Sequence, residues 1–212
     1  MARKTADLFV EVDLTQDLGY LIGVSCQLMV EAPSAGNTAQ RLVGLILEIQ
    51  SSEAQTIEDT MDAASATNTT SKKAGDLIIY EEGGDPRVIE VTQKAFDSQR
   101  MEDSYDSVRA MDETFGTETR EVVVLCREDD VPGSAEKTDD HTAVAIAYFG
   151  SASRLDLTFE FVDIFEWVAT QLSTMTESQR LEYHQQLSQY VADPNTSSTV
   201  KKVWAKRHDS DK

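Results

Sequence analysis

Apolar positions recur with helical spacing along several parts of the chain, and the clearest early example is residues 37–49. The apolar stripe of this segment consists of Leu42, Val43, Ile46 and Ile49. A stripe of this kind is typical of a helix that buries one face. Asn37, with Gln40 three residues later, also predicts a capping box at the helix start.

Three later segments show the same spacing. Residues 98–114 carry apolar side chains at Met101, Tyr105, Val108 and Met111. Residues 161–172 carry them at Val162, Phe165, Val168 and Leu172. Residues 176–191 begin with Thr176 and Gln179, a second capping-box pair, and are expected to bury Leu181, Leu187 and Tyr190. Each segment is therefore predicted to be a helix that packs on a core.

Continuous apolar runs indicate buried strands. The run "REVVVLCRE" (120–128) is apolar on both faces, which is typical of a central strand covered by helices, and "HTAVAIAYFG" (141–150) is a second such run. Residues 19–32 are buried as either helix or strand, and residues 7–14 suit a strand or a short helix. Residues 51–74 read as the tail of a helix followed by a flexible loop.

Together these elements predict one α/β domain with a mixed central β-sheet flanked by helices. We expect a single domain over residues 1–212, with a core at about 36–192 and a mobile, locally basic tail at 193–212. The length of 212 residues is enough to bury a sizeable core in one domain.

Composition narrows the class of protein. No apolar run reaches the roughly 18 residues that a membrane helix needs, so we expect a cytoplasmic protein with no membrane partner. The three histidines are widely separated in sequence and give no zinc spacing or catalytic triad.

Acids outnumber bases by 38 to 19, which gives a net charge of −19 that repels nucleic acid at long range. Three explanations remain open. They are an acidic surface suited to a high-salt host, a DNA-mimicking inhibitor, and a site where metal ions neutralise local acids.

Two short apolar runs around a Gly-Gly turn, within residues 72–96, predict a β-hairpin. Leu77 and Ile79 should share its buried face with Ile89 and Val91, the equivalent residues of the second run. Two registers fit this pattern. Asp76 lies opposite Glu90 in one and opposite Thr92 in the other, and both registers put Asp76 and Glu90 on the same face.

Facing acids normally destabilise a sheet, and a divalent cation would resolve the conflict between Asp76 and Glu90. If the second strand continues far enough, Thr92 and Lys94 share the face of Glu90. Lys94 would then orient or deprotonate an attacking water, or stabilise charge on a phosphate. The alternative is that Asp76 caps the strand, Glu90 points to solvent and Lys94 is an ordinary surface charge.

The stretch "AGDLIIYEEGGDPRVIEVTQK" (74–94) resembles the active-site hairpin of the PD-(D/E)XK phosphodiesterases. This resemblance implies a restriction-endonuclease-like fold over roughly residues 36–150. In that family an Asp and an acid-x-Lys motif on the next strand hold Mg²⁺ and activate water. By resemblance, Asp76, Glu90 and the Val91 carbonyl would hold Mg²⁺, or alternatively Mn²⁺.

Thr92 stands where this family has its lysine, and Lys94 is the expected replacement, so the implied catalytic set is Asp76, Glu90, Thr92 and Lys94. The preceding helix sometimes supplies a further acid in the family, for which Glu48 is the candidate.

These observations lead to the hypothesis of a Mg²⁺-dependent DNA endonuclease or the nuclease subunit of a restriction or other defence system. DNA is then the substrate, and a homodimer or a defence-system partner subunit is compatible with it. Two alternatives stay open. One is a non-catalytic adaptor of the same fold that binds a partner protein, and the other is an acidic DNA mimic.

Overall fold

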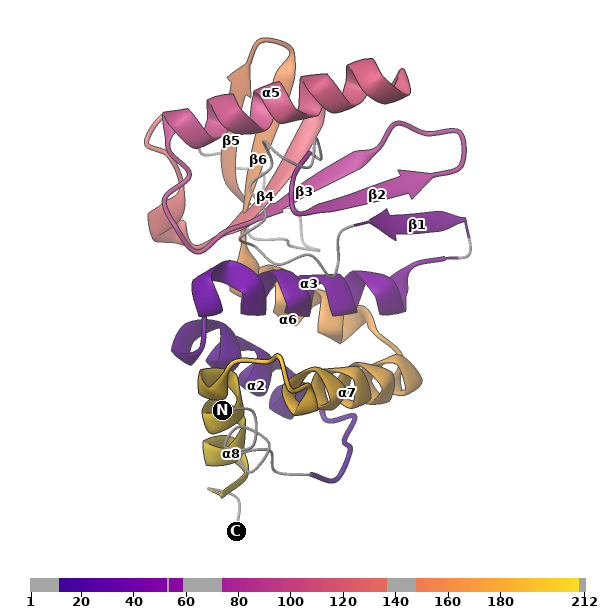
Figure 1. Ribbon diagram of the computed structural model, residues 1–212, viewed down its shortest axis with the longest axis vertical. Coiled ribbons are helices and arrows are strands. Elements are labelled where there is room, and N and C mark those ends of the chain that lie inside the picture. The colour runs from indigo at the N-terminus through magenta and orange to yellow at the C-terminus, as the bar shows by residue number, and fades with distance from the viewer. Residues whose placement is uncertain (1–11, 53, 59–73, 137–147, 210–212) are drawn as a thin grey trace.

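A six-stranded mixed sheet forms the centre of the protein (Figure 1). The computed structural model describes residues 12–52, 54–58, 74–136 and 148–209. The strand order is β1-β2-β3-β4-β6-β5. Strands β1, β2 and β3 are antiparallel, β3, β4 and β6 are parallel, and β5 is antiparallel to β6. The α/β class predicted from the sequence, a mixed sheet flanked by helices, is confirmed.

The strands are β1 (Gln55–Glu58), β2 (Leu77–Glu81), β3 (Arg87–Val91), β4 (Glu121–Cys126), β5 (Tyr148–Arg154) and β6 (Leu157–Asp163). The α-helices of the described residues are α2 (Leu18–Glu31), α3 (Asn37–Gln50), α5 (Ser98–Phe115), α6 (Ile164–Thr174), α7 (Glu177–Ala192) and α8 (Ser198–Asp209). Two short 3-10 turns, Ser34–Gly36 and Glu128–Asp130, complete the set.

Each face of the sheet packs on its own hydrophobic core. Helix α5 covers one face, where its Val108 and Met111 meet Val122 and Val124 of β4. Helices α3 and α6 lie against the other face, with α2, α7 and α8 beyond them (Figure 1). Strand β4 contributes to both cores, so the predicted central strand, apolar on both faces, is confirmed.

Helix α5 is anchored at both ends. At its start, the Asp97 side chain accepts a hydrogen bond from the Arg100 N–H at 3.0 Å, which satisfies one of the backbone donors left open at a helix N-terminus. At its end, buried Asp112 accepts hydrogen bonds from the backbone N–H of Thr119 (3.0 Å) and the hydroxyl of Thr117 (2.7 Å). Asp112 also pairs with Arg109 at 2.9 Å.

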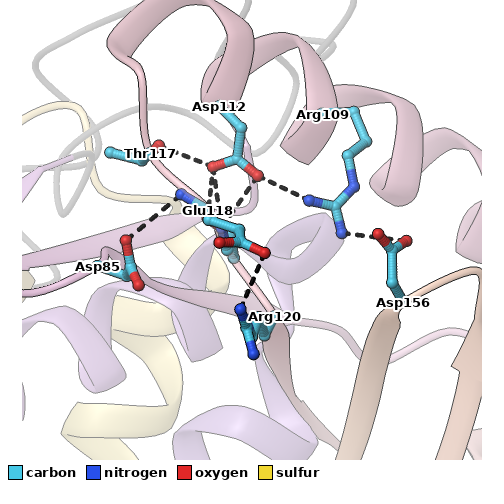
Figure 2. A network of polar contacts seen from close by, with 8 residues as sticks. Asp85, Arg109, Asp112, Thr117, Glu118, Arg120 and Asp156 are labelled. Atoms are coloured by element: carbon cyan, nitrogen blue, oxygen red, sulfur yellow. Dashed lines mark hydrogen bonds and ion pairs between the residues drawn. The ribbon is translucent and has the colours of Figure 1, made fainter.

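Figure 2 shows how this network joins neighbouring turns. Arg109 reaches Asp156 in the β5–β6 turn at 3.6 Å. The Glu118 N–H donates to Asp85, in the turn between β2 and β3, at 3.4 Å. The far end of α5 is therefore tied to the tips of two hairpins.

The sequence-based prediction is wrong at the start of α3 in one respect. The helix begins at Asn37 as predicted, but the N-cap is Gly36 and no side chain caps it. A 3-10 turn, Ser34–Gly36, runs directly into the helix, so Asn37 already has helical dihedral angles (φ −57°, ψ −36°) and does not act as the cap. The Gln40 side chain donates instead to the Asp76 carbonyl at 3.4 Å. At α7, by contrast, the predicted capping box of Thr176 and Gln179 is confirmed.

The predicted helix over residues 161–172 divides into the end of β6 and most of α6. Asp163 ends the strand and caps the helix, since its carboxylate accepts from the N–H groups of Phe165 and Glu166 at 2.9 Å each. Phe159 and Phe161 point from β6 into the α5 core. Val162 therefore belongs to the strand and not to a helical stripe.

The predicted tail at 193–212 is also corrected. Residues 198–209 form helix α8, and Val200, Val203 and Trp204 are buried in the core shared with α2. These residues repeat at helical spacing, which outweighs the basic side chains on the rest of the helix. Leu181 of α7 was expected in the core but is exposed, whereas Leu187 is buried as predicted.

Three other predicted segments remain to be placed. Residues 19–32, for which the sequence left helix and strand open, lie mostly in α2. Three predicted segments lie partly outside the described residues, at positions 7–11, 59–73 and 141–147. Strand β1 occupies residues 55–58 of the segment predicted as helix tail and loop. In the described part of the chain, no helix has the length and apolarity needed to cross a membrane.

Candidate metal centre

The β2–β3 hairpin brings the two predicted acids together. The strands pair Leu77 with Ile89 and Ile78 with Val88, which is the first of the two registers left open by the sequence. Continuing this register by one residue puts Asp76, which directly precedes β2, beside Glu90, and the charge of Asp76 acts on the Glu90 carboxyl group. Asp76 and Glu90 therefore lie close together, and the observed pairing favours the register that sets them opposite each other.

Two contacts fix the backbone and side chain of Asp76. Its N–H donates to the Ile89 carbonyl at 2.9 Å, and its Oδ2 accepts from the Val91 N–H at 2.8 Å. The carboxylate thus bonds to the backbone of β3 at the position where a further β2 residue would otherwise pair. This bond directs the Asp76 side chain along β3 toward Glu90.

Gly75 makes this close approach possible. Its φ is +70°, a conformation that residues with a Cβ atom rarely adopt. A Cβ atom at this position would lie 2.6 Å from Val88 Cγ1 and 2.9 Å from the Ile89 carbonyl oxygen. The chain therefore needs glycine immediately before Asp76.

Glu90 is almost fully buried, with 4% of the residue exposed. Ser104 of α5 donates its hydroxyl hydrogen bond to Glu90 Oε1 at 3.1 Å. Burial, and next the charge of Asp76, raise the pKa of Glu90 to about 8, while the positive charge of Arg100 acts in the opposite direction. Glu90 is therefore mainly protonated at neutral pH when no cation is bound.

Thr92 and Lys94 differ in where they lie. Strand β3 ends at Val91, so the condition that would put Lys94 on the face of Glu90 is not met, and the Lys94 residue is exposed in a bend. Thr92 is buried beside the acid pair, at 4% exposure. Its hydroxyl accepts from the Lys94 N–H and donates to the Lys94 carbonyl, both at 3.1 Å.

Arg100 is the residue of this site that the sequence analysis missed. Its Nη1 donates to Thr92 Oγ1 at 2.5 Å, and its guanidinium carbon lies 5.2 Å from the centre of the Phe96 ring. Helical spacing placed residue 100 in a helix but gave no indication that this side chain would reach Thr92. The one sequence signal was Asp97, a typical capping residue three positions earlier.

Gln40 was predicted as a capping residue, yet its side chain touches the backbone of Asp76. Glu48, the candidate third acid, is not brought to the pair. It forms a salt bridge with Arg41 at 3.8 Å and lines a polar cleft of about 750 Å³ between α3 and α7. The residues of α3 and α5 that contact the acid pair are therefore Gln40 and Ser104, and Glu48 is not one of them.

The donor atoms suit a small hard cation. Asp76 and Glu90 offer carboxylate oxygens, and the Val91 N–H faces Asp76, so the Val91 carbonyl of the same strand residue is directed to the same edge of β3. No group of three or more His, Cys, Asp or Glu side chains with metal-binding geometry occurs among the described residues. Two carboxylates with a backbone oxygen and water are a set that Mg²⁺ accepts.

Comparison with protein-family models and with curated proteins finds no match for this chain.

Proposed function

We propose that this protein is a Mg²⁺-dependent DNA endonuclease, or the nuclease subunit of a restriction or other defence system. The observation that supports this function best is the proximity of the Asp76 carboxylate, just before β2, to the buried carboxyl group of Glu90 on β3. Two acids packed together are unfavourable without a compensating cation or a shared proton. A divalent ion would replace the proton and use both side chains as ligands.

The order of elements also supports a PD-(D/E)XK assignment. Helix α3 precedes the β2–β3 hairpin, and α5 and then β4 follow it, as the resemblance requires. In the proposed site, Asp76, Glu90 and the Val91 carbonyl hold the ion. Mg²⁺ supplies Lewis acidity that activates water and offsets the charge of the phosphate.

The chain's own groups would orient the reactants. Ser104 fixes one Glu90 oxygen, and the Val91 N–H fixes one Asp76 oxygen, so both carboxylates keep a defined direction. In the hydrolysis, water oxygen forms a bond to phosphorus and one ester P–O bond breaks. One proton of water ends on the departing alcohol, and the other stays with the new phosphate monoester.

A plasmid-cleavage assay in Mg²⁺ or Mn²⁺, compared with EDTA, tests the proposal. Cleavage should require the metal and should fall at least about 100-fold in Asp76→Asn and Glu90→Gln. Glu82→Gln changes an exposed acid in the turn of the same hairpin and is the matched control, with wild-type cleavage expected. Mn²⁺ titration calorimetry should show loss of binding in the two site variants. Cleavage in EDTA, or retained in both site variants, would exclude this function.

One observation favours a second candidate. Thr92 stands where the family has its lysine and is bonded within the protein, as expected for a non-catalytic adaptor that kept the fold. An adaptor should associate stably with a partner protein and show no metal-dependent cleavage. The net charge of −19 also keeps the DNA-mimic alternative open. A mimic should compete with DNA for a DNA-binding protein and should not require Asp76 for that competition.

A further inference from the structure

We propose that Arg100 supplies the positive charge which the lysine of an acid-x-Lys motif would bring to this site. The cation comes from the first turn of α5 and not from β3. This inference rests on the proposed nuclease function and names the residue that would contact the scissile phosphate.

The position of Arg100 carries the argument. Arg100 Nη1 lies 2.5 Å from Thr92 Oγ1, which is the side chain at the lysine position of the motif. The charge of Arg100 also acts on Glu90, two residues before Thr92. The guanidinium therefore reaches the same side of β3 as the acid pair.

The side chain is held in place before any substrate arrives. Asp97 binds the Arg100 N–H and fixes the backbone of the first helical turn. The guanidinium lies over the Phe96 ring, whose buried face restricts its motion and favours a cation. The contacts of Asp112 fix the opposite end of the same helix. A pre-positioned charge of this kind loses little entropy when a phosphate binds.

Two other cations near the end of β3 suit this role less well. Lys94 is exposed, and it follows the end of the strand on a bend. Arg127 binds Asp130 through two nitrogens, at 2.7 and 3.2 Å. Arg100 is bonded to a neutral hydroxyl, so its positive charge is not cancelled by that contact.

An arginine changes the chemistry that the motif can perform. A guanidinium carries hydrogen-bond donors and no acceptor, so Arg100 does not remove a proton from water. Its part is to stabilise negative charge on the phosphate oxygens. The pH profile of cleavage should therefore lack the limb that titration of a lysine amine would produce.

The test compares four variants with the wild type in single-turnover cleavage. Arg100→Gln should slow cleavage by about 100-fold or more, while Arg100→Lys should keep most of the rate because it restores a charge. Lys94→Gln tests the competing assignment. Arg120→Gln, at an exposed position next to the opposite end of β4, is the control for loss of one positive charge.

A metal-binding measurement separates this role from simple damage to the fold. Arg100→Gln removes a positive charge beside the ligands, so Mn²⁺ binding by calorimetry should be unchanged or tighter. A merely structural role of Arg100 predicts weaker Mn²⁺ binding and a lower unfolding midpoint. If Arg100→Gln cleaves slowly and also shows weaker Mn²⁺ binding or a lower unfolding midpoint, the inference is overturned.

Rescue provides the strictest test. Thr92→Lys combined with Arg100→Gln rebuilds the usual motif and should recover at least about tenfold of the lost rate. If the wild type cleaves and Arg100→Gln keeps full activity, the Arg100 assignment is overturned. Loss of activity in Lys94→Gln alone also overturns it. Both results leave the nuclease function standing. Absence of metal-dependent cleavage in the wild type removes both.

Discussion

Asp76, directly before β2, lies beside Glu90 of β3, and the Asp76 charge acts on the buried Glu90 carboxyl group. Glu90 is the more deeply buried of the two, and burial and the Asp76 charge raise its pKa to about 8. The apo protein therefore keeps a proton where the proposed metal would bind.

This raised pKa predicts how stability depends on pH. Between about pH 4.5 and 8 the folded chain holds a proton on Glu90 that the unfolded chain has released. The stabilising contribution is complete below pH 4.5 and is lost as pH rises through 8, at up to about 1.4 kcal/mol per pH unit. In Glu90→Gln, urea unfolding at pH 5, 7 and 9 should lack this part of the decline. Glu82→Gln is the control and should show the same decline as the wild type. An equal decline in Glu90→Gln would contradict the assignment of the raised pKa to Glu90.

Gly75→Ala should destabilise the protein and disturb the acid pair. The new Cβ would clash with Val88 and with the Ile89 carbonyl, and φ of +70° would be strained. We expect a loss of about 2 kcal/mol or more in the free energy of unfolding. Gly84→Ala in the same hairpin is the matched control, because its Cβ would come no closer than 3.7 Å to another atom. A Gly75 variant as stable as the Gly84 variant would refute the argument.

Asp112→Ala should destabilise the protein far from the acid pair. It leaves Arg109 without its nearest carboxylate and removes the acceptor for the Thr119 N–H. Breaking a buried pair of this kind costs about 3 kcal/mol or more. Asp106→Ala, an exposed acid on the same helix, should change the urea midpoint little. Equal midpoints in the two variants would show that the network in Figure 2 contributes little stability.

His184 predicts an acid-sensitive packing of the outer helices. Burial, with a smaller effect of His208, lowers the pKa of His184 to about 4, and its Nδ1 accepts from the Thr15 N–H at 2.8 Å. The stabilising contribution is complete above pH 6.5 and is lost as pH falls through 4, because the unfolded chain gains its proton first. His184→Asn keeps an acceptor without the titration, so the fall in its unfolding free energy from pH 6.5 to 4 should be smaller. An unchanged fall would contradict this account.

The sequence was sufficient to predict the convergence of Asp76 and Glu90. Side chains alternate along a strand, and the short Gly-Gly turn permits few registers, so their relative placement is a local property. The capping box at Thr176 is local in the same way. Both features depend on spacings that can be counted along the chain.

Arg100 and Gln40 could not be assigned because their contacts are tertiary. Each belongs to a correctly predicted helix, but which strand its side chain reaches depends on how that helix packs on the sheet. Similarly, the end of β6 was predicted as helix because its last residues continue the apolar pattern of α6. Helix α8 was missed because the basic residues of the segment were weighted above Val200, Val203 and Trp204.

Strand β3 has more paired residues on its β4 side than on its β2 side. On one side of β3, four residue pairs link it to β4, and the Thr92 N–H extends this ladder by bonding to Leu125. On the other side, three pairs link it to β2, and there the Asp76 carboxylate takes the Val91 N–H. Opening of the β1–β2 ribbon would therefore separate Asp76 from Glu90 while β3 keeps its pairing with β4. Hydrogen exchange at the Val91 amide would report this opening directly.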